Sequence, residues 1–368
     1  MRIWSILNPS LSGSRHSETA TGLYNDAFVE STMDAMDFGS STATRDAGAR
    51  RQSEPPDYDW YCIDGGSDHI IRRMVDKIKT KPTTGVRVVA IQSTPSGEME
   101  VVSQTRDGKI KKTYSQVICT APLGCISAIE IPREDLSYMQ RLAIRGLNYD
   151  TSTKIALKFE SRWWEDPAIM GADRVIKGGT SSTDIPIRTC VYPSYGFNAT
   201  SKPPGVLLAS YTWAQDAQRL GGLAQGVGTE ADQRLVELTL QNLSQLHGIP
   251  LVDHYAYNWH NNEDARGAFA LFGPGQFGNR QQTNSMFVSM KAPAAGGKLH
   301  FAGEATSAHH AWVLGALNSA WRAVYSTLGR MQDAVIKREQ LIKEWKIPDE
   351  EDPESLIKLA VLAEANKL

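Results

Sequence analysis

The clearest pattern of apolar and polar positions lies near the C-terminal end of the chain. Residues 299–302 form a short apolar run, and Gly303 and Glu304 interrupt it. Apolar residues then recur at three- and four-residue intervals from Val313 to Leu328. This order predicts a strand, a turn and a helix. Small residues at such a turn let a ligand approach the backbone, and the helix start offers free N–H groups to a phosphate or a reduced ring.

Strand and helix patterns also alternate along the earlier part of the chain. Amphipathic helices are expected within 21–36 and 68–79. Beyond Arg330 a helical pattern continues, breaks at Pro348 and resumes after Pro353, which predicts a docking or oligomer helix or, alternatively, a solvated surface helix. Strands are expected at 86–92, on both sides of a turn at 107–108, and at 117–120, 153–159 and 206–213.

Composition narrows the classes of partner. The chain has 368 residues, 41% hydrophobic and 22% charged, which is enough for two domains with sizeable cores. Its 39 basic and 41 acidic residues leave a net charge of -2, so no field attracts nucleic acid or an anionic membrane. Small molecules, and a further copy of the chain, are therefore the partners that we expect.

Cysteine spacing and the chain ends bear on metals and location. The four cysteines show no CxxC or His-Cys spacing, so buried thiols and no metal are expected. The N-terminal apolar patch is too short for a signal peptide, and no run is long enough for a membrane span. These features predict a cytoplasmic protein. The final Asn-Lys-Leu misses the first residue of the peroxisomal Ser-Lys-Leu address, so a peroxisomal location is the lesser alternative.

Several motifs in a fixed order carry a family resemblance. The run AGEATSAHHAWVLGALNSAWRA, from Ala302 to Ala323, resembles the C-terminal flavin-binding signature of flavin-containing amine oxidases, in the fungal L-amino-acid oxidase branch. The Gly65-Gly66 turn, the strand ending in Thr-Ala-Pro-Leu-Gly and the later Thr-Lys-Ile run are similar to earlier family motifs. The Asp-Pro usual in the family's Trp and Gly-Ala-aromatic motif is replaced by Asn262-Glu263. The resemblance extends from about residue 20 to about residue 330.

This resemblance implies an α/β, FAD-dependent amine oxidase-like fold of two domains. The FAD-binding domain is expected to be an incomplete Rossmann-type domain, because we identify no first strand, Gly-x-Gly-x-x-Gly turn and helix in that order. The substrate domain is expected to contain a mixed sheet. The expected boundaries are 1–59 for a remnant of the helical substrate region, 60–134 for the middle of the FAD-binding domain, 135–292 for the substrate-binding domain, 293–331 for the C-terminal part of the FAD-binding domain and 332–368 for a helical tail.

The resemblance also implies a set of site residues. Lys154 would manage water and protons beside the flavin, and Tyr211 would orient a substrate carboxylate. From the residues alone, Lys154 is equally a strand-edge lysine that reaches solvent, and Tyr211 a core tyrosine. His309 and His310 are adjacent and are expected to be structural. The implied catalytic residues are Lys154, Tyr211 and Trp312, and the implied cofactor-binding residues are Val88, Thr120, Ala121, Pro122, Trp259, Gly303, Glu304, Ala305, Trp312 and Val313.

The implied activity is FAD-dependent oxidation of an L-amino acid by molecular oxygen, giving a 2-oxo acid, ammonia and hydrogen peroxide. An amino-acid 2-monooxygenase or another amine oxidase on the same fold is an alternative. Two further alternatives follow from the missing glycine motif. The chain is then an inactive truncated remnant, or one half of a split enzyme whose N-terminal nucleotide-binding half is a separate chain.

Overall fold

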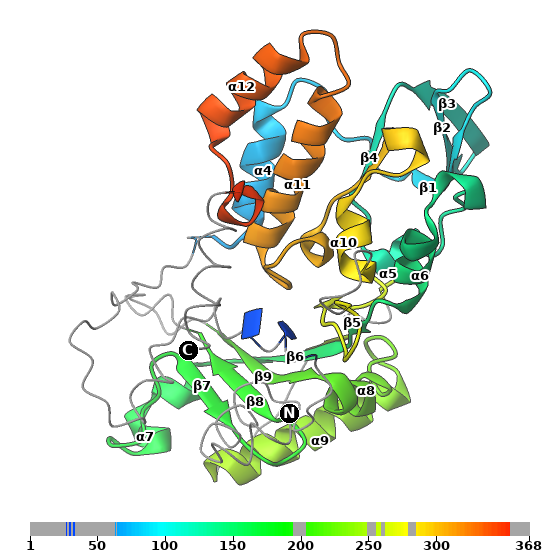
Figure 1. The fold of residues 1–368 in the computed structure, drawn as a ribbon. Coiled ribbons are helices and arrows are strands. Elements are labelled where there is room, and N and C mark those ends of the chain that lie inside the picture. Colours follow the sequence, from blue (N-terminus) through cyan, green and yellow to red (C-terminus); the bar gives the residue numbers. More distant parts are fainter. Residues whose placement is uncertain are drawn as a thin grey trace. The chain divides into compact units, whose positions relative to one another are not determined.

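A computed structural model describes residues 27, 29, 30, 32, 33, 63, 65–193, 204–248, 255–258, 262–278 and 285–353. The chain divides into two compact units, which are coloured along the sequence in Figure 1. Unit 1 includes Ser41–Lys79 and Asp150–Ala268, and unit 2 includes Asn25–Ser40, Thr80–Tyr149 and Phe269–Leu368. Each unit therefore combines stretches that are far apart in the sequence.

Unit 1 is built on a five-stranded sheet, drawn in green in Figure 1. Its ladders are antiparallel, and an isolated parallel bridge joins Arg188 to Tyr211. The sheet order is β10 (Tyr255–Asn258), β6 (Ser152–Phe159), β9 (Gly205–Trp213), β8 (Thr189–Tyr192) and β7 (Gly179–Ser182). In its described part, this unit has the helices α4 (Asp68–Lys77), α7 (Pro167–Met170), α8 (Ala214–Gly221) and α9 (Glu230–His247) and a 3-10 turn at Trp163–Glu165.

Buried and more exposed side chains alternate along β6, which explains how this strand packs into the core of unit 1. Ile155, Leu157 and Phe159 are buried, whereas Lys158 is exposed. A period of two places alternate side chains on opposite faces of a strand, so one face of β6 packs into the core. The buried side chains of β9, α9 and the Trp163-Trp164 pair complete that core.

Unit 2 contains small sheets with helices around them. β1 (Arg87–Ser93), β2 (Met99–Thr105) and β3 (Gly108–Tyr114) form an antiparallel meander, and β4 (Val117–Cys119) pairs in parallel with β12 (Leu299–Phe301). A short pairing joins β5 (Tyr149–Asp150) to β11 (Phe269–Ala270). The helices are α5 (Leu123–Ile126), α6 (Tyr138–Gly146), α10 (Met286–Lys291), α11 (Val313–Leu328) and α12 (Ala334–Trp345), with 3-10 turns at Arg133–Asp135, Glu304–Thr306 and Asp349–Glu351.

Local signals account for many of these elements. Ser137 and Gln140 form a reciprocal capping box that starts α6, and the Thr229 hydroxyl accepts the Asp232 N–H at the start of α9. Gly248 ends α9 with a left-handed φ of 72°. The predicted strands and helices are confirmed where the structure describes them. Of the described residues in the helix expected within 21–36, residues 29, 30, 32 and 33 are helical and residue 27 is not.

Other expectations have mixed outcomes. Cys119 and Cys190 are buried free thiols and Cys125 is half-buried, while Cys62 lies outside the described residues. The tail forms α12 and ends before Pro348 as predicted, but the stretch that resumes beyond residue 353 lies outside the described residues. No helix in the described part of the chain is both long and apolar enough to cross a bilayer.

One stretch has the letters of a dinucleotide motif without its structure. Residues 273–278 read Gly-Pro-Gly-Gln-Phe-Gly, which fits Gly-x-Gly-x-x-Gly, but they form turns held by the Gln276 side chain. The Gln276 amide donates to the Gly146 carbonyl at 2.7 Å, and the Phe277 ring packs against Phe272 and Phe287. These glycines serve a packed turn of unit 2, so letter spacing alone does not identify a phosphate loop.

Candidate functional site

The ends of two parallel strands bring distant predicted residues together in unit 2. Phe301 of β12 is in register with Cys119 of β4, and the Ala302 N–H donates to the Cys119 carbonyl at 3.0 Å. The chain continues from these ends into 120–122 and 303–305. Ligands of α/β proteins bind at the carboxyl ends of parallel strands. The predicted cofactor residues Thr120, Ala121, Pro122, Gly303, Glu304 and Ala305 therefore lie at such an edge.

Gly303 has a conformation that its residue type permits. Its φ is 149° and its ψ is 162°, a region that side chains with a Cβ rarely adopt. Its N–H donates to the Ser319 hydroxyl of α11 at 2.9 Å, and Ser319 is fully buried. A Cβ at Gly303 would meet no heavy atom within 4 Å. The backbone of Gly303 thus ties the end of β12 to α11. The space that a side chain at residue 303 would occupy is open.

Glu304 holds three segments of unit 2. Its Oε1 accepts the Tyr149 hydroxyl at 2.7 Å and the Ala270 N–H at 3.2 Å, and its Oε2 accepts the Ala311 N–H at 3.0 Å. Burial, followed by the charge of Glu304, raises the pKa of Tyr149 well above its usual range. Tyr149 is therefore a fixed hydrogen-bond donor. The sequence did not indicate Tyr149 as a site residue, because no local pattern links this tyrosine to Glu304.

The start of α11 is open. Trp312 occupies the N-cap position with no side-chain cap, Val313 is 62% exposed and Leu314 is 51% exposed. The first N–H groups of a helix carry a partial positive charge. An apolar surface beside such groups suits a flat ring that is electron-rich on one edge. Trp312 and Val313, which the resemblance implies as cofactor-binding residues, lie at this helix start.

In unit 1, the structure brings Lys154 and Tyr211 together. They are direct partners in the β6–β9 register, and the Lys154 Nζ lies 4.6 Å from the centroid of the Tyr211 ring. Desolvation lowers the pKa of Lys154. Among the described residues the amine has no hydrogen-bond acceptor, and a half-buried ammonium without a carboxylate is costly. Such an amine, with its pKa moved toward neutrality, is a candidate for proton transfer.

Two more groups surround this pair. The Tyr211 and Trp213 rings meet edge to face with centroids 5.0 Å apart, and burial raises the pKa of Tyr211. Desolvation also raises the pKa of Asp150 to about 6, despite the Ala214 N–H that its Oδ2 accepts at 3.2 Å. Asp150 lies close enough to act electrostatically on Tyr211. Sequence reasoning did not select Asp150, although it precedes β6 by two residues.

Two of the predicted cofactor-binding residues, Val88 and Trp259, have no described contact with the groups above. Val88 lies in β1 beside a β-bulge and packs, half-buried, against the core of unit 2. Trp259 lies outside the described residues. No cluster of three His, Cys, Asp or Glu residues that could hold a metal occurs in the ranges that the structure describes.

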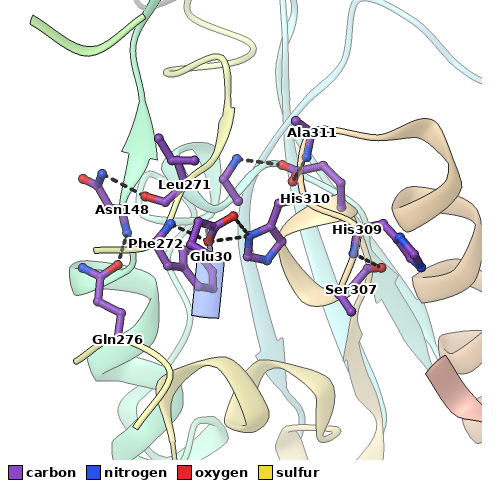
Figure 2. Close-up of polar contacts among 12 residues, drawn as sticks. Glu30, Asn148, Leu271, Phe272, Gln276, Ser307, His309, His310 and Ala311 are labelled. Carbon is purple, nitrogen blue, oxygen red and sulfur yellow. Dashed lines mark hydrogen bonds and ion pairs between the residues drawn. The ribbon is translucent and has the colours of Figure 1, made fainter. Parts of the chain in front are cut away.

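A buried carboxylate and imidazole form a further pair that the sequence did not indicate. The Nδ1 of His310 lies 2.9 Å from both carboxylate oxygens of Glu30, as Figure 2 shows. The Nε2 of His310 is buried and has no hydrogen-bond partner among the residues that the structure describes. Because 280 residues separate the two side chains, neither spacing nor periodicity connects them.

Comparison with known proteins now defines the class. A model of the flavin containing amine oxidoreductase family matches residues 14–327. The chain therefore belongs to that family, and its fold is the FAD-dependent amine oxidase fold. The chain is 37% identical over 327 residues to L-amino-acid oxidase 4 of Hebeloma cylindrosporum, covering 84% of this chain and 49% of that protein.

Other relatives agree on the family. A Dictyostelium discoideum protein named as a bifunctional amine oxidase is 38% identical, with 92% of this chain and 30% of that protein covered. An L-amino-acid oxidase of Siganus canaliculatus is 31% identical, with 71% and 46% covered. The chain thus spans about half or less of the length of these relatives. A putrescine oxidase structure has a TM-score of 0.54 and 16% identity, covering 74% of this chain and 53% of that one, which shows the fold alone.

The cofactor of this family is a flavin, and the residues present fit one. The evidence is the open start of α11, the unobstructed space at Gly303 and the orphaned Nε2 of His310 in the same unit. Buried polar atoms normally have a partner, so an orphaned one indicates a missing water or ligand group.

Proposed function

We propose that the protein is an FAD-dependent L-amino-acid oxidase, which converts an L-amino acid, oxygen and water to a 2-oxo acid, ammonia and hydrogen peroxide. The observation that carries the proposal is the desolvated amine of Lys154 held over Tyr211, in a chain of the flavin-containing family. The named relatives from Hebeloma cylindrosporum and Siganus canaliculatus support the choice of an amino acid over another amine.

Unit 2 would hold the flavin through residues on both sides of the β4 and β12 ends. The segments 120–122 and 303–305 offer backbone, and Trp312 and Val313 offer ring surface and helix N–H groups. A flavin held there would supply the acceptor for a hydride from the substrate α-carbon and a route for its electrons to oxygen. Glu304 keeps this edge in one conformation, because each of its two oxygens has a donor.

Unit 1 would handle the substrate and its protons. The substrate must lose a proton from its ammonium group before its α-hydrogen can leave as hydride, so a nearby base is required. Lys154 fits that role because its lowered pKa makes the neutral amine more available than in an ordinary lysine. The Tyr211 hydroxyl, whose raised pKa keeps it protonated, would donate to the substrate carboxylate.

The test begins with the absorbance spectrum of the purified chain with and without added FAD. Bound flavin and peroxide release from L- but not D-amino acids are expected. Lys154→Met should retain flavin but lower kcat by roughly 100-fold or more, the usual range for losing a proton-transfer group. Lys158→Met is the matched control, since Lys158 lies on the same strand and is exposed. Flavin binding without peroxide release, or equal rates in the two variants, would reject the proposal.

A further inference from the structure

The segment Ser307–Trp312, which leads into α11, is fixed by three carboxylates of unit 2, of which Glu30 and Glu350 are distant in the sequence and Glu304 is nearby. Glu350 accepts the Ser307 hydroxyl at 2.6 Å and the Ala308 N–H at 2.8 Å. Glu304 accepts the Ala311 N–H, and Glu30 contacts His310. Figure 2 shows Glu30 and His310 with the neighbouring residues of this segment. A six-residue connection with this many charged contacts has one conformation rather than many.

The Glu30 and His310 pair is the most enclosed of these contacts. Glu30 is 2% exposed and His310 is 7% exposed. The Oε2 of Glu30 also accepts the Phe272 N–H at 2.9 Å, and the Phe272 ring centroid lies 4.5 Å from that of His310. The rings of Phe277 and Phe287 lie 6.1 Å and 5.7 Å from the imidazole. The imidazole therefore sits among aromatic rings, with Glu30 as its polar neighbour.

The geometry determines the position of the imidazole proton. An ionised carboxylate only accepts hydrogen bonds, and a backbone N–H only donates. Glu30 meets both the Phe272 N–H and His310 Nδ1, so Nδ1 carries a proton toward the carboxylate. Ala311, the next residue, has a φ of 65°, which a residue with a Cβ adopts only when its surroundings hold it there.

We propose that Glu30 is a positioning residue for the start of α11. By accepting both N–H groups it fixes the orientation and tautomer of His310, and so holds Ala311 in its left-handed conformation and Trp312 at the N-cap. The inference rests on the proposed function, in which Trp312 and Val313 face the flavin. It assigns a role in cofactor positioning to a residue almost 300 positions before the helix that it positions.

The first test needs no flavin. In ¹⁵N-histidine spectra of the full chain, the His310 signal, assigned by its loss in His310→Asn, should show a protonated Nδ1. In Glu30→Gln the amide oxygen can still accept the Phe272 N–H, but only if its NH₂ group turns toward Nδ1. His310 should therefore change to the Nε2–H tautomer. An Nε2–H tautomer in the parent protein, or an unchanged signal in Glu30→Gln, would overturn the proposal.

The second test uses the chain with added FAD. Glu30→Gln should weaken FAD binding roughly 10-fold and shift the visible flavin band, because a displaced helix start presents a different surface. Asp135→Asn is the matched control: Asp135 is also buried in unit 2 and accepts the Ser93 N–H at 2.8 Å, but it does not touch the Ser307–Trp312 segment. Equal effects in the two variants would make Glu30 merely structural. If the parent binds no FAD, the proposed function fails, and the tautomer alone decides whether Glu30 fixes His310.

Discussion

The charged groups at the candidate site of unit 1 have fewer hydrogen-bond partners than those of unit 2. Among the described residues Lys154 has no hydrogen-bond acceptor, and the N–H groups that Asp150 accepts do not outweigh its desolvation. Burial favours the neutral form of both Lys154 and Asp150, because it lowers the pKa of the amine and raises that of the carboxyl. In unit 2, burial would raise the pKa of Glu350, but hydrogen bonds from Ser307 and Ala308 and the charge of Lys291 outweigh it and leave the pKa lowered. Burial of a charged group thus has opposite net results in the two units, depending on the donors that the group receives.

This difference separates scaffold from reactive group. A carboxylate with all its donors supplied is stable in one ionisation state and holds backbone segments in place. An amine or carboxyl whose neutral form is favoured by burial has its pKa displaced from the ordinary value, as is common for groups that transfer protons. We therefore expect substitutions of the partnered carboxylates Glu304 and Glu350 in unit 2 to cost stability. Substitutions of Lys154 and Asp150 in unit 1 should cost function while preserving or improving stability.

Removing the carboxylate of Glu304 should have the largest effect. Glu304→Ala leaves the Tyr149 hydroxyl and the N–H groups of Ala270 and Ala311 without their acceptor, and should lower the free energy of unfolding by about 3 to 5 kcal/mol. Urea unfolding measures this loss of stability. Tyr149→Phe removes one donor and leaves the carboxylate, so about 1.5 kcal/mol is expected. Equal losses in the two variants would show that Glu304 does not hold the three segments.

Asp150→Asn should raise the free energy of unfolding rather than lower it. The folded pKa of Asp150, about 6, lies above the unfolded value near 3.9, so the ionised carboxyl destabilises the fold above pH 6 and costs nothing below about pH 4. The variant should be more stable by on the order of 2 kcal/mol at pH 7, with the gain vanishing by pH 4. Thermal unfolding against pH tests this. Asp216→Asn is the contrast, since Asp216 pairs with Arg188 at 3.3 Å and should lose stability.

Glu350→Gln should destabilise by about 1.5 kcal/mol, the contribution of a hydrogen bond to a charged group. The folded pKa of Glu350 lies below its unfolded value, so its stabilisation is present above the unfolded pKa and is lost as the pH falls through the folded one. The two proteins should therefore converge in acid, once the pH lies below the folded pKa of Glu350. Glu344→Gln, an exposed position on α12, should change stability by less than about 0.5 kcal/mol. A loss that persists unchanged at acid pH would contradict this account.

The sequence predicted those parts of the site that depend on neighbours along the chain. Alternation in 153–159 identified β6 and placed Lys154 on it, and the strand, glycine and helix order from residue 299 identified β12 and α11. Gly303 was recognised as a turn residue, and its φ of 149° shows why glycine is there. Each signal concerns a single strand, turn or helix.

The contacts between distant segments could not be predicted. Glu30 and His310 are 280 positions apart, and the Lys154–Tyr211 pairing depends on a register that shifts at Ile155 and Ala156. A one-residue change of register would turn Tyr211 to the other face of the sheet. Tertiary packing decides such contacts, and one sequence gives no periodic signal for them.

Lys154→Met has the smallest predicted effect on stability and is the sharpest test of the difference between the charged groups of unit 1 and those of unit 2. Lys154→Met should raise the free energy of unfolding by about 0.5 kcal/mol at pH 7, because it removes a desolvated ammonium and keeps an unbranched apolar chain beside the Tyr211 ring. The folded pKa of Lys154 is below its unfolded value near 10.4, so its ionised form destabilises below the folded pKa, and this cost disappears as the pH rises toward 10.4. The difference between variant and parent should therefore shrink in alkaline solution. Lys158→Met, at an exposed position of the same strand, should show no such trend. If Lys154→Met instead lost stability at pH 7, the amine would have a partner after all, and Lys154 would belong with the scaffold groups of unit 2.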